Sequence, residues 1–344
     1  MPPPHLLALS ELPGWQEDAS FEAYPALLAS CSTISALPPD QTMDFGGAPA
    51  EWRESCAAIA RLKAALVADT NGALRQVMEA QFVALDPGAG SPALVTGYYE
   101  PELQGSRIKD AAHPYPLYRL PKNPTRYDRA EIDTGALRGK QLELLWVSDK
   151  VEAFFLQVQG SGRVRLASGE VVRVGFAGTN ERQYVSIGKA MVDAGLMTKE
   201  EASLQSIRAY LNAHPDEIDS WLQRNPRYVF FKEQKAADPN EGPVGALHVP
   251  LTPGRSIAVD PAFTPLGLPV WLDTTQPVTN APLQRLVVAQ DKGSAIKGSG
   301  RIDLFWGAGE EAEAMAGPMR QQGTYWVIVP RSVGERWLLQ QAGS

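Results

Sequence analysis

The 344-residue sequence has few histidines and cysteines, the side chains that most often bind zinc. A structural zinc site needs three or four Cys, His or acidic ligands at characteristic spacings. Here the histidines are isolated, and neither cysteine belongs to a CxxC motif. We therefore expect no metal site and no cofactor. The four histidines are His5, His113, His214 and His248.

The two cysteines, Cys31 and Cys56, lie 25 positions apart near the start of the chain. They could form one disulfide if the protein is exported, or they could be two buried thiols. Cys56 falls on the apolar face of a predicted helix, where Cys commonly acts as a small core residue. This slightly favours unpaired thiols.

Excess positive charge and long apolar runs are also absent. With 32 Lys and Arg against 39 Asp and Glu, the net charge is −7, which argues against a nucleic-acid-binding protein. No apolar run reaches the length of about 18 residues that a membrane-spanning helix needs. The first residues lack the charged and apolar regions of a signal peptide, so we expect a cytoplasmic protein or a mature chain whose export signal has been removed.

The length suggests about two domains, and the 28 prolines and 30 glycines favour short strands separated by turns. A polar segment rich in Pro and Gly at 236–243 is the predicted domain boundary. Helical periodicity is expected at 20–30, 51–69, 74–82, 186–194, 198–211 and 215–225, and strands at 94–101, 115–119, 142–147, 152–159, 163–166, 171–176, 228–231, 256–259, 269–272, 286–289 and 324–329.

Two glutamines stand out in the apolar run 152–159. If this run is a strand, Gln157 and Gln159 point to the same face because side chains alternate along a strand. Buried amides need hydrogen-bond partners, so this face is a candidate binding surface.

The segment 289–309 holds two carboxylates, Asp291 and Asp303, around a glycine-rich stretch that contains Lys297. Asp303 lies within the apolar run Ile302–Trp306. A buried carboxyl has a raised pKa, which suits a general acid near neutral pH. The same sequence is also compatible with an exposed Asp303 that caps a turn at the end of a strand.

Other catalytic patterns are not met. Ser161 lies in no G-x-S-x-G elbow, the aspartic-protease-like triplet at Asp291 has no second copy, and the glycine-rich stretch does not match a phosphate loop. What remains is carboxylates near aromatic residues, which suits sugar rings.

Several ordered motifs together resemble the MltA family of membrane-bound lytic murein transglycosylases. The resemblance covers roughly residues 94–331. It rests on Thr96–Pro101, Tyr115–Tyr118, Gln157–Gly162, Gly175–Asn180, Tyr184–Gly188, Asn225–Phe231, Ile257–Asp260, Pro265–Gly267 and Asp291–Asp303 with Gly307–Gly309.

The resemblance implies a mainly β fold with helices. A double-psi β-barrel domain with N-terminal helices would comprise residues 1–101 and 244–344. A smaller β domain at 102–243 would be inserted into it, and a groove between the two domains would hold a glycan strand.

The resemblance also implies an enzyme of cell-wall turnover. Such an enzyme cleaves the β-1,4 bond between N-acetylmuramic acid and N-acetylglucosamine in peptidoglycan without water and leaves 1,6-anhydro ends. On the matching motif, Asp303 is the acid and then the base, and Asp291 supports it, although the reverse assignment is open. Lys297 could line the groove or neutralise Asp291. The predicted substrate-binding residues are Tyr99, Gln157, Gln159, Gly160, Ser161 and Lys297.

Two further functions stay open: a non-catalytic glycan-binding or wall-loosening module on the same barrel, and a hydrolase that uses both acids. The family implies a position on the periplasmic side of the outer membrane, with a lipid anchor on the full-length protein. It also implies glycan strands as partner, a monomer, and contact with cell-wall synthesis or division proteins.

Overall fold

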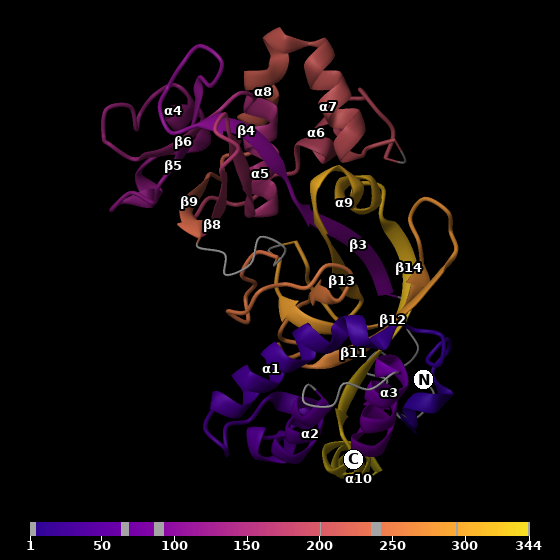
Figure 1. Cartoon of the computed structure of the whole chain (residues 1–344). Helices are drawn as coiled ribbons and strands as arrows, with labels where there is room; N and C mark the ends of the chain where they lie inside the picture. Colours follow the sequence, from indigo (N-terminus) through magenta and orange to yellow (C-terminus); the bar gives the residue numbers. More distant parts are fainter. Residues whose placement is uncertain are drawn as a thin grey trace. The chain divides into compact units, whose positions relative to one another are not determined.

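The computed structural model describes residues 5–62, 69–85, 93–199, 201–234, 242–293 and 295–342. The chain divides into two compact units (Figure 1). The first unit comprises residues 1–98, 244–307 and 319–344, and the second comprises 99–243 and 308–318. This division places the segment 308–318 with the second unit.

A closed ring of strands forms the centre of the first unit. The strand order β14-β11-β12-β10-β13-β3 returns to β14 through a β14–β3 pairing, and β2 and β1 extend the sheet beyond β14. β10 and β12 are parallel, whereas β11 is antiparallel to both of its neighbours. The strands are β1 (Leu6–Leu7), β2 (Phe82–Leu85), β3 (Ala93–Glu100), β10 (Ser256–Ala258), β11 (Pro269–Thr275), β12 (Pro282–Asp291), β13 (Arg301–Ala308) and β14 (Arg320–Pro330).

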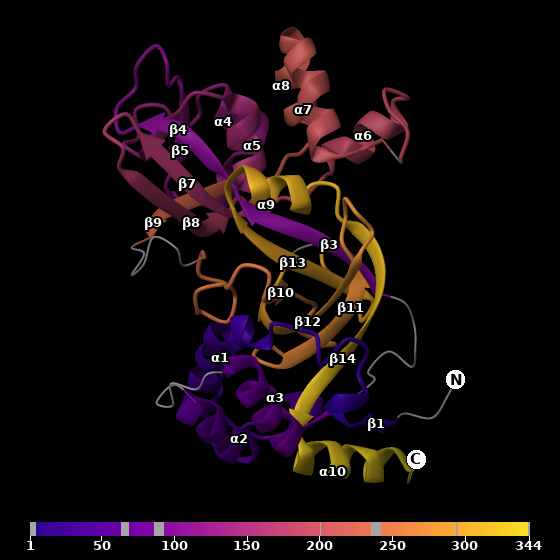
Figure 2. The same ribbon diagram turned by 45° about the vertical axis from the view of Figure 1, so that its right-hand side comes forward.

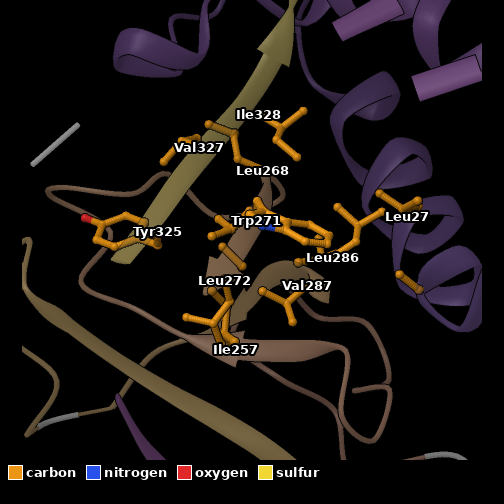
Figure 3. Close-up of a cluster of buried hydrophobic side chains, with 14 of the residues drawn as sticks. Leu27, Ile257, Leu268, Trp271, Leu272, Leu286, Val287, Tyr325, Val327 and Ile328 are labelled. Carbon is orange, nitrogen blue, oxygen red and sulfur yellow. The ribbon is translucent and has the colours of Figure 1, made fainter. Parts of the chain in front are cut away.

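Helices cover one end of this ring, where α1, α2 and α3 gather with α10 (Figure 1). Their apolar faces join the strands in one core, in which Leu27 of α1 points toward Trp271 and Leu286 (Figure 3). Burying such large side chains is the main stabilising contribution to the unit. The helices are α1 (Tyr24–Ala36), α2 (Pro49–Leu62), α3 (Thr70–Gln81) and α10 (Arg331–Ala342), with short 3-10 turns at Leu9–Glu11, Ser20–Ala23 and Asp44–Gly46.

The preference for unpaired cysteines is wrong, because Cys31 and Cys56 form a disulfide. Cys31 lies on α1 and Cys56 on α2, and the two helices pack against each other in the core. The apolar helical face around Cys56 is compatible with a thiol or a disulfide, so the helical pattern alone could not decide between them.

The second unit is a six-stranded sheet in the order β5-β6-β4-β7-β8-β9, and α5 packs on it. The helices α6, α7 and α8 pack on α5 and stand to the side of the sheet (Figure 2). β5 is an edge strand, as Pro116 within it requires. The strands are β4 (Glu102–Ser106), β5 (Tyr115–Tyr118), β6 (Glu143–Val147), β7 (Ser161–Leu166), β8 (Val171–Thr179) and β9 (Val229–Gln234). The helices are α4 (Arg129–Asp133), α5 (Lys150–Gln159), α6 (Ile187–Asp193), α7 (Leu204–Ala213), α8 (Ile218–Leu222) and α9 (Gly309–Ala316), with 3-10 turns at Pro124–Arg126 and Pro215–Glu217.

One predicted strand is a helix. The run 152–159 belongs to α5, whose first turn is capped by the Asp149 carboxylate and whose end is Gly160 in the left-handed conformation. Both are standard helix end signals. An apolar run of this length does not by itself separate a buried strand from a buried helix, and the end signals were the better guide.

Most other predicted elements are confirmed with shifted ends. α3 begins at Thr70, four positions before the predicted start at residue 74, and α7 begins at Leu204 rather than near Thr198. The part of the predicted helix 51–69 beyond Leu62, and most of the predicted boundary at 236–243, lie outside the described residues. Within the described ranges, no helix combines the length and apolar character needed to cross a membrane.

Candidate functional site

The two aspartates predicted to be catalytic flank the same short strand. Ala258 on β10 is in register with Asp291 on the parallel strand β12 and with Asp303 on the antiparallel strand β13. Neighbouring strands lie about 4.8 Å apart, so the two aspartate backbones are roughly 10 Å apart across β10. Residues in register point to the same face of a sheet. The fold therefore brings together two carboxylates that are twelve positions apart in sequence.

A β-bulge sets this alignment. Ile257 pairs with Ala289, but Ala258 pairs with Asp291, so Gln290 is the extra residue. The buried Gln290 amide donates to the carbonyl of Ala26 and the hydroxyl of Ser30, and its Oε1 accepts from Ser256. A bulge redirects the side chains that follow it, and this one places Asp291 beside Ala258.

Asp303 is a half-buried carboxyl with one hydrogen-bond donor among the described residues. The Thr96 hydroxyl donates to its Oδ1 at 2.7 Å, and Arg301 donates to that hydroxyl at 3.4 Å. Burial raises the pKa of Asp303 to about 6, opposed by the Thr96 hydrogen bond and the Arg301 charge and aided by the negative charge of Asp291. A carboxyl with this pKa is about half protonated near pH 6 and about one tenth protonated at pH 7, so a protonated form is present, as a general acid requires.

Asp291 is held by several donors. The Tyr98 hydroxyl donates to its Oδ2 at 3.0 Å, and the backbone N–H of Ala246 donates to its Oδ1 at 2.9 Å. Burial raises its pKa, while hydrogen bonds from the Lys292 backbone, Tyr98 and Ala246 oppose that rise. Burial and the negative charges of Asp291 and Asp303 raise the pKa of Tyr98 well above its usual value, so this hydroxyl stays protonated as a donor. Both oxygens of Asp291 thus accept hydrogen bonds that fix its position. The Oδ2 of Asp303 accepts none from the described residues.

β3 supplies a donor to each aspartate through residues two positions apart. Thr96 and Tyr98 share a face of the strand, and Tyr99 lies on the other face. The structure places the predicted binding residue Tyr99 in the second unit, buried, with its hydroxyl accepting from Arg208 at 3.1 Å. The residue that contacts an aspartate is Tyr98. Counting two positions from Thr96 would have selected it from the sequence.

The glycine-rich loop after Asp291 is anchored by a residue that sequence reasoning missed. The Oδ2 of Asp260 accepts from the backbone N–H of Gly298 at 2.8 Å. That bond is the main cause of a lowered pKa for Asp260, to which the charge of the exposed Lys297 also contributes. The sequence left open whether Lys297 neutralises Asp291. The lysine whose charge lowers the pKa of Asp291 is Lys292. Ser294 in this loop lies outside the described residues.

Comparison with known proteins identifies two family segments. Residues 94–128 and 122–232 match the model of the "MltA specific insert domain", and 255–329 match the "3D domain". The Vibrio cholerae membrane-bound lytic murein transglycosylase A is 35% identical over 68% of this chain and 65% of its own length. The chain thus spans a little less than two thirds of that relative.

Solved structures extend the similarity to nearly the whole chain. A lytic transglycosylase, LtgG, of Burkholderia pseudomallei is 45% identical over 96% of both chains, with a TM-score of 0.67. Escherichia coli MltA with bound chitohexaose is 30% identical over 91% of both chains, with a TM-score of 0.73.

The chain belongs to the MltA family.

Within this MltA-family chain, the two matched segments carry different parts of the predicted site. The segment 255–329 runs from β10 to β14 and holds both aspartates. The insert-domain segment begins at β3, which supplies Thr96 and Tyr98, and continues through the second unit.

The predicted glutamine face is not formed. Positions two apart on a helix point in different directions, so Gln157 and Gln159 at the end of α5 do not share a face. Gln157 is buried, and its Oε1 accepts from Arg129 at 2.7 Å. Gly160 ends the helix, and Ser161 begins β7 opposite Gly175. All four belong to the second unit, and their roles in binding stay predictions.

No group of three or more His, Cys, Asp or Glu side chains suited to a metal ion occurs in the described parts of the chain.

Proposed function

We propose that this protein is a lytic transglycosylase of peptidoglycan. In this proposal it cleaves the β-1,4 bond between N-acetylmuramic acid and N-acetylglucosamine and forms a 1,6-anhydro ring on the muramic acid. Its relatives are named for murein transglycosylase activity, and one MltA structure contains chitohexaose, a β-1,4-linked amino-sugar chain. The single observation that carries the assignment is the contrast between the aspartates. In the part of the chain that the structure describes, Asp303 is a carboxyl of pKa about 6 with one donor, and Asp291 is held by Tyr98 and the Ala246 backbone.

The first chemical step uses the protonated form of Asp303. Its proton passes to the glycosidic oxygen as the bond from that oxygen to C1 of the muramic acid breaks. The N-acetylglucosamine leaves with a free 4-hydroxyl, and Asp303 becomes a carboxylate. Thr96 donates to Oδ1, which leaves Oδ2 to carry the transferred proton.

The second step regenerates the acid. The Asp303 carboxylate takes the proton of the C6 hydroxyl, whose oxygen forms the new bond to C1. No water is consumed, and one carboxyl serves both steps. Because the attacking hydroxyl belongs to the same sugar, it reacts at high effective concentration, whereas glycosidases that use water need two carboxylates.

Asp291 has a supporting role in this proposal. Its charge raises the pKa of Asp303 and disfavours a second negative charge nearby. Held by Tyr98 and Ala246, it can also accept a hydrogen bond from the glycan. Gln159, Gly160, Ser161 and Lys297 stay proposed glycan contacts. Tyr99 and Gln157 are buried and already bonded to arginines.

The closed ring of six strands supports the proposal that the first unit is a double-psi barrel, with 1–101 and 244–344 as one domain and 102–243 as the insert. We further propose that the protein works as a monomer on glycan strands at the periplasmic side of the outer membrane, with a lipid anchor on the full-length protein. The disulfide suits an oxidising compartment, and the relatives are named membrane-bound.

The test is the release of soluble sugar fragments from purified peptidoglycan by the unaltered protein and two variants. Asp303→Asn should reduce the rate by at least about 10³-fold, since it removes the only acid, whereas Asp291→Asn should leave a reduced but measurable rate. Equal loss in both variants would favour a pair of catalytic carboxylates. Binding without release by the unaltered protein would favour a glycan-binding module.

A further inference from the structure

The second unit contains a cavity of about 240 Å³ between α4, α5 and the strands β5 and β6. That is space for on the order of eight water molecules, or for one to two amino-acid residues. Its wall contains Tyr115 and Trp146, and Lys109 lies 5.4 Å from the Trp146 ring centre. The cavity belongs to the second unit alone, and neither Asp291 nor Asp303 lines it.

A buried cation lies in the wall of the cavity. Arg129 is 2% exposed and packs against the rings of Phe154 and Tyr228, with its guanidinium 4.7 and 5.1 Å from their centres. It donates to the carbonyls of Asn225 and Arg227 and to Gln157 Oε1, which are all neutral acceptors. Among the described residues it forms no salt bridge, and its Nη1 forms no hydrogen bond. The negative charge of Asp133, on the same helix, acts on this guanidinium without forming a salt bridge with it. A carboxylate in the cavity would give the guanidinium a direct ion pair.

A buried carboxylate oxygen lacks a donor in the same wall. The Oδ2 of Asp133 is inaccessible to solvent and has no hydrogen-bond partner among the described residues. The nearest cation, Lys150, is 3.9 Å away and is paired with Asp219. Leaving such an oxygen unpaired is unfavourable. The Asp133 side chain as a whole is 11% exposed, so an ammonium group in the cavity would pair with the exposed part of the carboxylate and offset its charge.

Neither a simple anion nor a simple cation satisfies both groups. Because Arg129 and Asp133 lie close enough to act on each other, an anion placed against Arg129 would repel Asp133, and a cation placed against Asp133 would repel Arg129. A neutral sugar offers hydroxyls to both but forms an ion pair with neither. Two more exposed cations, Lys109 and Arg138, and one acid, Glu143, complete the charged lining, so the cavity is amphoteric with a positive excess.

We propose that this cavity binds a peptide through a zwitterionic end group, in which one carbon carries both an ammonium and a carboxylate. The stem peptides of peptidoglycan carry such a group. Its carboxylate pairs with Arg129, its ammonium donates to Asp133, and its aliphatic chain lies along Tyr115 and Trp146. The choice of a stem peptide rests on the proposed function, whereas the zwitterion chemistry rests on the cavity alone.

The experiment measures calorimetric binding of a synthetic stem tetrapeptide to the full chain. A second probe is the same peptide with its side-chain ammonium acetylated, and a third is chitohexaose. We expect saturable binding of the free peptide and a loss of about tenfold or more on acetylation, since a charged hydrogen bond is removed. This comparison uses one unaltered protein and does not depend on the folding of a variant.

Variants then locate the site. Asp133→Asn should weaken binding of the free peptide about tenfold and leave the acetylated peptide unaffected. Asp193→Asn, the same substitution at an exposed position of α6 outside the cavity lining, should change neither. Lys109→Gln removes one positive charge from the exposed rim of the cavity. It tests whether the positive excess of the cavity lining contributes to binding, with little risk to the fold.

Equal affinity for the free and acetylated peptides would overturn the proposal, as would no binding at millimolar peptide. Chitohexaose binding that Asp133→Asn abolishes would instead make the cavity a sugar subsite and would also overturn it. Failure of the proposed function looks different. In that case peptide-free glycan strands are not cleaved, while the peptide result is unaffected.

Discussion

Asp291 and Asp303 lie on opposite sides of Ala258, each in register with it, on the two strands that flank β10. Both side chains are half-buried and both have raised pKa values because of burial. They differ in their donors, since Tyr98 and the Ala246 backbone hold Asp291, whereas Thr96 is the one donor to Asp303 within the described ranges. This difference separates a fixed carboxylate from one that can exchange a proton.

Replacing Thr96 by Val removes the hydroxyl donated to Asp303 at nearly constant volume. The Thr96 hydrogen bond lowers the pKa of Asp303, so the variant carboxyl should lose its proton at higher pH. We expect the alkaline limb of the pH–rate profile to move to higher pH and the maximum rate to fall about tenfold. Thr96→Ser keeps the hydroxyl and should retain the original profile. Identical profiles for Val and Thr would show that this bond does not tune the acid.

Replacing Tyr98 by Phe tests how Asp291 is held. The ring should keep its packing against Phe305, whose centre is 5.2 Å away, while Asp291 loses one donor. Losing a hydrogen bond to a buried charged group costs about 1–3 kcal/mol, so the cleavage rate should fall about tenfold or more with the fold intact. Tyr210→Phe removes a similar bond to Glu217 in the second unit and should leave the rate unchanged. A fully active Tyr98→Phe protein would contradict the role given to Asp291.

Stability against pH provides a test that needs no substrate. Burial raises the folded-state pKa of Asp303 to about 6 from 3.8. Between those values the folded state binds more protons than the unfolded state, so this group's contribution to stability falls as pH rises and stays low above about pH 6. Asp303→Asn cannot ionise and should be more stable than the unaltered protein at pH 8, by up to about 3 kcal/mol. At about pH 4 the two should be nearly equal.

Urea unfolding of both proteins at the two pH values, followed by the fluorescence of the tryptophans, measures this difference. The two units can unfold in separate transitions. The comparison between the unaltered protein and the variant uses the transition that Asp303→Asn shifts. A variant that is equally or less stable at both pH values would show that Asp303 is not destabilised by ionisation.

The disulfide joins α1 to α2 across a separation of 25 residues. Closing a loop of that length restricts the unfolded chain and contributes about 3 kcal/mol on the chain-entropy model. The double variant Cys31→Ala/Cys56→Ala should therefore have a lower melting temperature, with cleavage by correctly folded protein retained because neither cysteine contacts an aspartate. Equal melting temperatures would mean that the link does not stabilise the first unit.

The sequence predicted five strands of the first unit, β3, β10, β11, β12 and β14, but not β1, β2 or β13. It also selected two aspartates that the fold brings to either side of one strand. The apolar run around Asp303 and the family motifs both pointed to that residue. The sequence could not reveal that β10 lies between β12 and β13, because strand order depends on contacts between distant segments. The bulge at Gln290, which sets the alignment of the aspartates, leaves no local sequence signal.

One error had a local cause. The run 152–159 was assigned by its apolar content, although Asp149 and Gly160 are helix end signals. The contact of Tyr98 with Asp291 was not predicted, and the role of Tyr99 in binding stays a prediction. Asp260 was missed because its role is to hold the backbone of a loop nearly forty positions away, a contact that exists only in the folded chain.

The most direct test of the central claim, that Asp303 acts as acid and base with the sugar's own hydroxyl as nucleophile, is mass spectrometry of the products formed from purified peptidoglycan in water labelled with heavy oxygen. The account predicts fragments lighter than hydrolysed fragments by one water molecule, with no label incorporated, and no fragments from Asp303→Asn. Labelled, hydrated ends formed by the unaltered protein would contradict it, because they would show that water attacks C1.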